Sequence, residues 1–167
     1  MKKIIILAVL SLSLAACKKS THNTASYIKA TINGVDYNFN KFTLNSFVKD
    51  TTYAGYDGEL LQVIAAVDSG ANSTSINFSL ADYTGIKNQV YSSIENNDND
   101  LFVIFSPKES DMPYQIAGVD HPVILKVTSA TTSVIQGTFS GNVYYDGDDA
   151  AAVKVITNGK FYINLNQ

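Results

Sequence analysis

The sequence predicts an all-β domain whose strands are mostly antiparallel, and three observations support this prediction. Apolar and polar residues alternate with a period of two through most of the chain from Tyr27 onward, which is typical of half-buried strands. No stretch has the apolar spacing of an amphipathic helix of three turns. The alternating runs are separated by dipeptides that favour tight turns, namely Asn33-Gly34, Asp57-Gly58, Ser69-Gly70 and Asp146-Gly147.

The strands can be placed in order along the chain. The first two alternate on either side of Asn33-Gly34, which predicts a hairpin with a type I′ turn, because both central residues of that turn need a positive φ. In two runs, 60–67 and 101–105, apolar residues occupy both alternating sets of positions, which predicts central strands that are covered on both faces. The alternating strands, including the two of this hairpin, are predicted at residues 27–32, 35–39, 75–80, 123–127, 135–145 and 153–165.

This spacing of runs and turns is typical of roughly eight to ten strands in an antiparallel β-sandwich or flattened barrel. A calycin-like closed barrel is the alternative architecture. Gly137 and Gly141 fall on the apolar parity of the longest run, where glycine permits a sharp bend or the close approach of another backbone. Asn158-Gly159 interrupts the last run. Because Val155 and Phe161 keep the same parity across it, we interpret it as a bulge within one strand.

The composition excludes several classes of protein. The chain has 167 residues, of which 46% are hydrophobic and 16% are charged, so it suits one domain and is too apolar to be disordered throughout. A single cysteine rules out a disulfide scaffold. The net charge is −3 and every basic residue other than histidine is a lysine. Without arginine to form paired hydrogen bonds with phosphate, we expect no nucleic-acid partner.

The N-terminal residues predict an export signal and a lipid anchor. Lys2 and Lys3 precede the apolar run 4–14, which is too short for a membrane-spanning helix and is typical of a signal peptide. We assign this signal peptide to residues 1–16. Leu14-Ala15-Ala16-Cys17 has the form of a bacterial lipobox, so we expect a lipid such as palmitate on Cys17. Two or three acyl chains hold a protein almost permanently at a membrane.

Three short motifs lie at predicted strands and turns. They are Thr31-Ile32-Asn33-Gly34-Val35, Gly137-Thr138-Phe139 and Thr157-Asn158-Gly159-Lys160-Phe161. Together they resemble motifs of small uncharacterised Bacteroidota lipoproteins that carry an all-β domain of unknown function. The resemblance spans most of the chain after Cys17. It implies an all-β lipoprotein, and it brings neither an activity nor assigned site residues to this chain.

The residues after the lipobox predict how the domain is held. Residues 17–25 have no apolar periodicity and form the lipidated cysteine and a tether, which leaves 26–167 as a single all-β domain. The residue after Cys17 is lysine rather than aspartate, which by resemblance to other bacterial lipoproteins indicates the outer membrane. Outward-facing Bacteroidota lipoproteins often carry acidic residues at this place. The sequence therefore leaves open whether the domain faces the periplasm or the cell surface.

Candidate catalytic residues are few. His121 lies between Asp120 and Pro122 at the start of a predicted strand, where a Ser/His/Asp hydrolase could use it as the base. Adjacent residues of a strand point to opposite faces, so Asp120 is poorly placed to orient this imidazole. The chain has no Gly-x-Ser-x-Gly elbow, and Cys17 is occupied by the anchor. We therefore expect no catalytic residues.

Candidate ligand-binding residues lie in loops. Residues 95–100 form one loop rich in carboxylate and amide oxygens, which calcium binds. A second such loop contains Asp146, Asp148 and Asp149, which are our calcium candidates, although neither loop has EF-hand spacing and both suit ordinary turns. No other cofactor is expected. Six tyrosines in predicted loops or on polar parities could contact sugar or protein: Tyr53, Tyr56, Tyr83, Tyr91, Tyr114 and Tyr144.

From these observations we expect a membrane-anchored protein without enzymatic activity. It would act as a binding or structural component of the outer envelope, with an envelope protein or glycan as its partner. Two alternatives stay open. The first is a carrier that holds a small ligand in an apolar pocket of a calycin-like barrel. The second is a hydrolase centred on His121.

Overall fold

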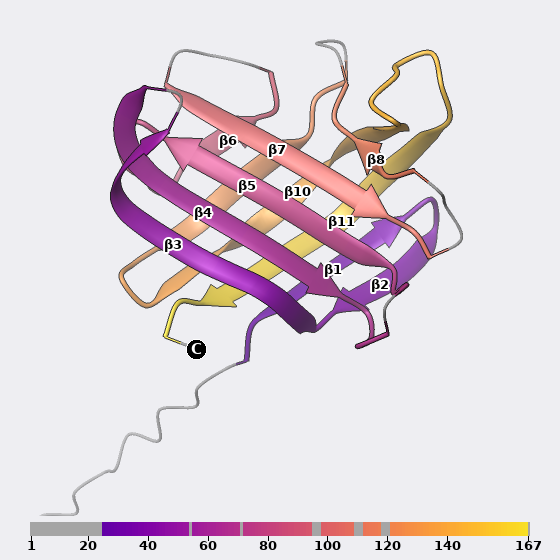
Figure 1. Ribbon diagram of the computed structural model, residues 1–167, viewed down its shortest axis with the longest axis horizontal. Coiled ribbons are helices and arrows are strands. Elements are labelled where there is room, and N and C mark those ends of the chain that lie inside the picture. The colour runs from indigo at the N-terminus through magenta and orange to yellow at the C-terminus, as the bar shows by residue number, and fades with distance from the viewer. Residues whose placement is uncertain are drawn as a thin grey trace, which may run out of the picture.

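The computed structural model describes residues 25–53, 55–70, 72–94, 98–108, 112–117 and 121–166. Within these ranges the chain forms strands and no helix, which confirms the all-β prediction (Figure 1). The predicted signal peptide, the Cys17 lipidation site and most of the predicted tether lie outside the described residues. The strands are β1 (Tyr27–Ile32), β2 (Val35–Phe39), β3 (Lys41–Tyr53), β4 (Tyr56–Ala66), β5 (Ser75–Asp82), β6 (Val90–Ser92), β7 (Asn99–Ser106), β8 (Tyr114–Gln115), β9 (Ile124–Ala130), β10 (Val134–Tyr145) and β11 (Val153–Asn164).

The described strands belong to one eleven-stranded antiparallel sheet that curls back on itself. Its main path runs β2-β1-β11-β10-β8-β7-β5-β4-β3, while β9 and β6 branch from β10. The two ends of the path, β2 and β3, are separated by Asn40 alone, and the Asn40 N–H donates to the Ala66 carbonyl oxygen in β4 over 3.1 Å. The sheet thus nearly closes into a barrel, as predicted. No helix in the described ranges has the length and apolar character needed to cross a membrane.

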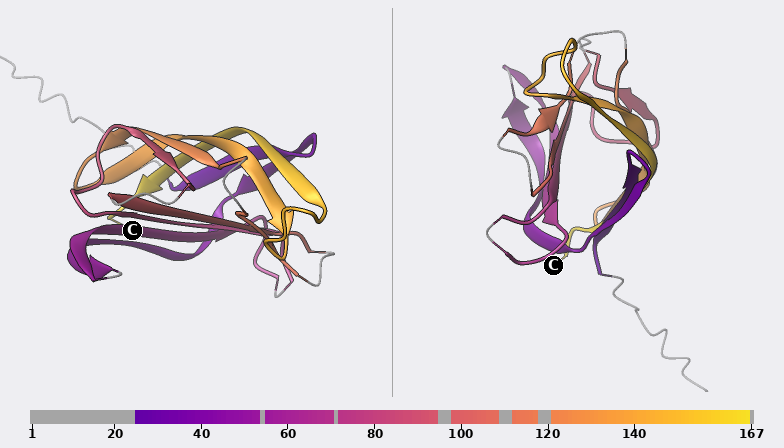
Figure 2. Two further views of the ribbon diagram at one scale, coloured as in Figure 1. Left: turned by 90° about the horizontal axis from the view of Figure 1, so that it is seen from above. Right: turned by 90° about the vertical axis from the view of Figure 1, so that its right-hand side faces the viewer.

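The barrel is flattened into two layers (Figure 2). One layer contains β3, β4, β5 and β7, and the other contains β2, β1, β11, β10, β9 and β6. Phe78 of β5 and Phe161 of β11 meet edge to face between the layers, with ring centroids 5.5 Å apart. Burial of such large rings supplies much of the stabilisation of a β-domain. Other large side chains that are fully buried include Phe39, Tyr91 and Phe105.

The apolar runs 60–67 and 101–105 form central strands, but only their inner faces are fully covered. Leu61 and Val103 point inward and are each 1% exposed. On the outer face Phe102 is 40% exposed, and Ile64 and Ile104 are half-buried. The prediction of burial on both faces was therefore wrong. In the described ranges no further layer of structure covers the outside of β4 and β7.

Glycines let β10 pass close to other backbone segments. A Cβ at Gly137 would collide with the carbonyl oxygen of Lys126 and with the Phe161 ring. A Cβ at Gly141, whose φ is 144°, would lie 2.5 Å from the Pro122 carbonyl oxygen. Both positions confirm the predicted close approach, because any larger side chain would force the neighbouring strand away.

The predicted hairpin turn at Asn33-Gly34 and the predicted bulge are both present, whereas the turn predicted at Asp57-Gly58 was wrong, because both residues lie within β4 and pair with β3. Asn33 and Gly34 have φ values of 47° and 80° between β1 and β2, as the type I′ hairpin requires. β11 runs without interruption from Val153 to Asn164, and its register against both β1 and β10 shifts around Asn158. Asn158 has a φ of 51°. The interpretation of Asn158-Gly159 as a bulge within one strand is therefore confirmed.

Candidate functional site

The outer face of the layer that contains β1, β11, β10 and β9 carries three lysines in one row across the strands. We call this surface the lysine face. Lys29 of β1 lies directly opposite Lys160 of β11. Lys160 is also opposite Thr138 of β10, which in turn is opposite Lys126 of β9. All four side chains are exposed, and they share one face because residues opposite one another in a sheet point to the same side.

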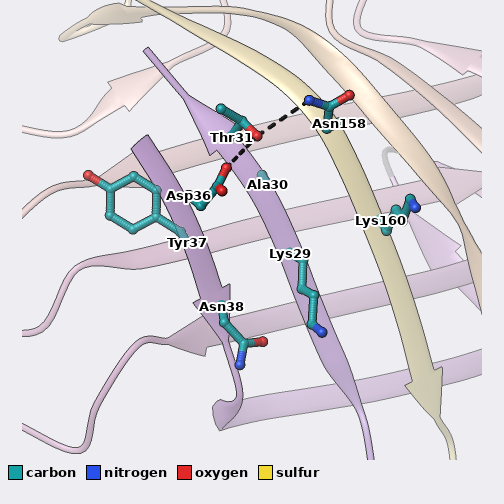
Figure 3. A pocket seen from close by; sticks show the side chains of 8 residues that line it. All are labelled: Lys29, Ala30, Thr31, Asp36, Tyr37, Asn38, Asn158 and Lys160. Carbon is teal, nitrogen blue, oxygen red and sulfur yellow. Dashed lines mark hydrogen bonds between the residues drawn. The ribbon is translucent and has the colours of Figure 1, made fainter. Parts of the chain in front are cut away.

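Two shallow hollows lie on the lysine face, one on each side of β11. The first has a volume of about 540 Å³ and lies over β2, β1 and β11, with Lys29 in its lining (Figure 3). The second has a volume of about 420 Å³ and lies over β11, β10, β9 and β6, with Lys126 and Thr138 in its lining. Lys160 and Asn158 line both hollows, so the two adjoin across the bulged strand.

The bulge of β11 shapes one end of the first hollow. Asn158 Nδ2 donates a hydrogen bond to Thr31 Oγ1 over 3.5 Å, and the Thr31 hydroxyl donates to Asp36 Oδ1 over 2.7 Å. Figure 3 shows these three side chains together at one end of the hollow, whereas Lys29 lies farther along β1. The hollow therefore combines amide, hydroxyl and carboxylate groups with ammonium groups.

Two tyrosines extend the lysine face along the strands. Tyr27 of β1 lies opposite Tyr162 of β11, and their rings stack with centroids 5.9 Å apart and planes inclined by 14°. Both rings remain partly exposed. The Lys29 Nζ atom lies 5.3 Å from the centroid of the Tyr27 ring, a distance at which the cation is attracted to the ring face. Tyr27 thus restricts the Lys29 side chain over the sheet.

The lysine row has no internal charge compensation. In the described part of the chain the ion pair joins Lys49 Nζ to Glu59 Oε1 over 3.2 Å, outside the lysine face. Lys29, Lys126 and Lys160 form no ion pair with any described residue. Like charges on directly opposed residues destabilise a pair of strands. The opposed positions of Lys29 and Lys160 therefore place two like charges on neighbouring strands without an ion-pair partner among the described residues.

The structure places the predicted hydrolase residue at the surface. His121 is exposed and lies just before β9, whereas Asp120 lies outside the described residues. The hydrolase alternative therefore stays a prediction.

The predicted calcium residues lie in the connection between β10 and β11. Asp146, Asp148 and Asp149 are all exposed, and Asp148 Oδ1 accepts the N–H of Ala150 over 3.0 Å, which is a common role of aspartate in turns. Across the described ranges no group of three His, Cys, Asp or Glu side chains is arranged to hold a metal ion. The second candidate loop, 95–100, is described only from residue 98 onward. Calcium binding stays a prediction without an assembled ligand set.

Three of the six tyrosines that we expected at a contact surface lie in the core. Tyr91, Tyr114 and Tyr144 are 1%, 9% and 6% exposed, so their rings are not available to a partner. Tyr83 is half-buried, and its hydroxyl donates to Asp100 Oδ2 over 2.6 Å. The side chains of the remaining two, Tyr53 and Tyr56, lie outside the description. The stacked pair on the lysine face consists of two tyrosines that the sequence analysis did not select.

Two carboxylates with low exposure are engaged in holding the fold together. Asp82 is 1% exposed and accepts hydrogen bonds from Thr84 and Gln89 in the connection between β5 and β6, and from Tyr91 in β6. Glu59 Oε2 accepts the N–H of Ile86 over 2.8 Å, while its other oxygen pairs with Lys49. Their hydrogen-bonding capacity is used within the domain.

The chain was compared with models of protein families, with curated proteins and with solved structures, and none of the three comparisons gave a match. The lysine face was also missed by the sequence analysis. Each of the three lysines, Lys29, Lys126 and Lys160, occupies a polar position in the alternation of a predicted strand, so the sequence indicated that each would face solvent. To place them in one row, the order of the strands in the sheet and the register of their pairing must be known, and the alternation of apolar and polar residues specifies neither.

Proposed function

We propose that this chain is a membrane-anchored lipoprotein of the bacterial cell envelope, without enzymatic activity, whose β-domain binds an envelope component through the lysine face. The observation that carries the proposal is the row of three exposed lysines without a carboxylate partner among the described residues. Because like charges on neighbouring strands repel one another, a negatively charged partner would be attracted to this row and would offset the repulsion. The predicted outer-membrane location would supply such a partner on either face of that membrane.

The position of the N-terminus is compatible with this role. β1 begins at Tyr27, which lies on the lysine face, and the predicted tether joins β1 directly to Cys17. Nine extended residues reach about 30 Å at most. A lipid on Cys17 would therefore hold the lysine face within reach of components at the membrane surface.

The anchor is tested by metabolic labelling and cell fractionation. Radiolabelled palmitate should enter the wild-type protein and should be lost in Cys17→Ser, because the serine hydroxyl cannot form the thioether. The wild-type protein should fractionate with the outer membrane. Equal labelling of the two proteins, or labelling of neither, would contradict the anchor.

Binding by the lysine face is tested on envelope material from which lipids have been washed with detergent. Purified full-chain protein in the same detergent should sediment with this material. The triple variant Lys29→Gln/Lys126→Gln/Lys160→Gln should stay in the supernatant. A control variant, Lys41→Gln/Lys87→Gln/Lys108→Gln, removes the same charge from exposed positions elsewhere and should sediment like the wild type. Equal sedimentation of both variants would show that the lysine face is not the binding surface.

A further inference from the structure

The lysine face carries a more specific inference, which rests on the binding role proposed above. We infer that its ligand is an acidic polysaccharide, a chain of sugar residues that bear carboxylate groups, lying across β1, β11, β10 and β9 along the lysine row. Three features of the lysine face favour this ligand, namely the length of the row, the neutral groups beside it and the tyrosines that border it.

The row is long enough to require several anionic groups in one ligand. Neighbouring strands are about 4.8 Å apart, so the backbones at Lys29 and Lys126, three spacings apart, are separated by about 14 Å. A single phosphate or carboxylate contacts one end of such a row and leaves the other uncompensated. An extended chain with repeated negative charges contacts all three ammonium groups.

The neutral groups beside the lysines fit sugar hydroxyls. Asn38 lies opposite Lys29, and Asn158 lines both hollows, so amide donors and acceptors flank the ammonium groups. Asp36 is a carboxylate in the lining of the first hollow, where it accepts the Thr31 hydroxyl and can accept other hydroxyl donors, but repels anions. A ligand that satisfies this hollow needs hydroxyl groups as well as negative charge. Acidic sugars have both.

The tyrosine pair gives the lysine face a partly apolar border. Tyr27 and Tyr162 lie two residues along their strands from Lys29 and Lys160, which is about 7 Å. Their partly exposed rings offer an apolar surface to the faces of sugar rings. Tyr27 also restricts Lys29, so less side-chain freedom is lost when an anion binds.

A lipid surface fits the hollows less well. Of the described residues that line them, Val90 is the one large apolar side chain that is strongly exposed, at 58%. Insertion into lipid requires a larger apolar surface, with charged residues around it. The overall charge of −3 does not prevent binding, because interactions beyond about 8 Å are screened at physiological ionic strength.

The test is calorimetric titration of the purified full-chain protein in detergent with four probes. They are polygalacturonate, neutral dextran, inorganic polyphosphate and a short-chain phosphatidylglycerol. We expect polygalacturonate to bind more tightly than the other three. The Lys29→Gln/Lys126→Gln/Lys160→Gln variant should lose about tenfold or more in affinity, since several exposed charge contacts together account for a change of this order. The Lys41→Gln/Lys87→Gln/Lys108→Gln control should bind like the wild type.

Two variants of Tyr162 test whether the ligand is recognised as a sugar and not only by its charge. Tyr162→Ala should weaken binding of polygalacturonate, whereas Tyr162→Phe, which keeps the ring, should bind like the wild type; melting curves establish that each variant is folded. Equal or tighter binding of polyphosphate or phosphatidylglycerol would overturn the inference. The inference would also be overturned if polygalacturonate failed to bind while sedimentation with envelope material still required the lysine face. That result would leave the proposed function intact. Sedimentation that does not depend on these lysines defeats the proposed function itself.

Discussion

Tyr91 donates a hydrogen bond from its hydroxyl to Asp82 Oδ2 over 2.9 Å, and each of the two side chains is only 1% exposed. Gln89 Nε2 donates to the same oxygen over 3.0 Å, and the other oxygen accepts the backbone N–H and the hydroxyl of Thr84. The backbone N–H of Lys87 donates in turn to the Tyr91 hydroxyl. A buried carboxylate with donors on both oxygens thus orders the connection between β5 and β6.

We predict that Tyr91→Phe destabilises the domain although it keeps the ring. The variant removes a donor from the buried carboxylate of Asp82 and leaves the Lys87 N–H without its acceptor. Loss of one partner of a buried polar group costs about 1–3 kcal/mol. Urea unfolding at neutral pH measures this difference. An unchanged free energy of unfolding would show that the hydroxyl makes no net contribution.

The same tyrosine predicts a loss of stability at alkaline pH. Burial raises the pKa of Tyr91 well above its usual range, and the nearby carboxylate of Asp82 raises it further. Tyrosine in the unfolded chain ionises near pH 10. The contribution of Tyr91 to stability is therefore complete below about pH 10 and declines at higher pH, by up to about 1.4 kcal/mol per pH unit. Unfolding curves recorded above pH 10 should show a smaller decline for Tyr91→Phe than for the wild type.

Gly137→Ala should destabilise the sheet through overpacking. The added methyl group would collide with the Lys126 carbonyl oxygen of β9, and it would lie 2.8 Å from Cζ of Phe161. Overpacking of this kind costs about 1–3 kcal/mol. Ser140→Ala, at an exposed position of the same strand, is the control and should leave the denaturation midpoint almost unchanged. Similar midpoints for Gly137→Ala and the wild type would mean that β9 moves away without cost.

Asn33→Ala should also destabilise the domain, for two separable reasons. Asn33 has a φ of 47°, which costs about 1–2 kcal/mol for an ordinary residue. Its Oδ1 atom also accepts the N–H of Val155 in β11 over 2.7 Å. Asn33→Gly keeps the turn conformation and loses only the side-chain hydrogen bonds, namely this one and the one that Asn33 Nδ2 donates to the Val153 carbonyl oxygen over 3.5 Å, so we expect its melting temperature to fall between those of the wild type and Asn33→Ala. Equal melting temperatures for the two variants would assign the whole effect to these hydrogen bonds.

Local features of the fold could be predicted from the sequence because they depend on neighbouring residues. The hairpin turn at Asn33-Gly34 follows from the φ values these residues tolerate. The bulge at Asn158 was anticipated from the Asn-Gly dipeptide within one apolar run, but the shared parity of Val155 and Phe161 is lost across it, because the added residue in β11 leaves Val155 42% exposed and Phe161 buried. The tyrosines were harder to place. Val143 continues the buried parity of β10, but the next residue, Tyr144, is also buried, and alternation alone does not predict burial on the outward-facing parity of a strand.

The lysine face could not be predicted from the alternation of apolar and polar residues, because it depends on which strands pair. Lys29 and Lys160 become neighbours only because the first strand pairs with the last, and nothing in either segment specifies that pairing. Lys126 joins them through Thr138, across a further strand of the sheet. A candidate site composed of side chains from three strands therefore depends on long-range topology, whereas the turn dipeptides depend on local backbone preference.

The position of β11 between β1 and β10 has a consequence for the synthesis of the protein. The ribosome makes the N-terminal hairpin first and the strand that completes its sheet last. Until Val153–Asn164 has emerged, β1 and β10 each present an open edge to which other chains can add. A product that stops before Val153 also lacks Phe161 and Ile163, which fill the interior. Premature termination near the end of the gene should therefore yield an aggregating polypeptide rather than a slightly shortened domain.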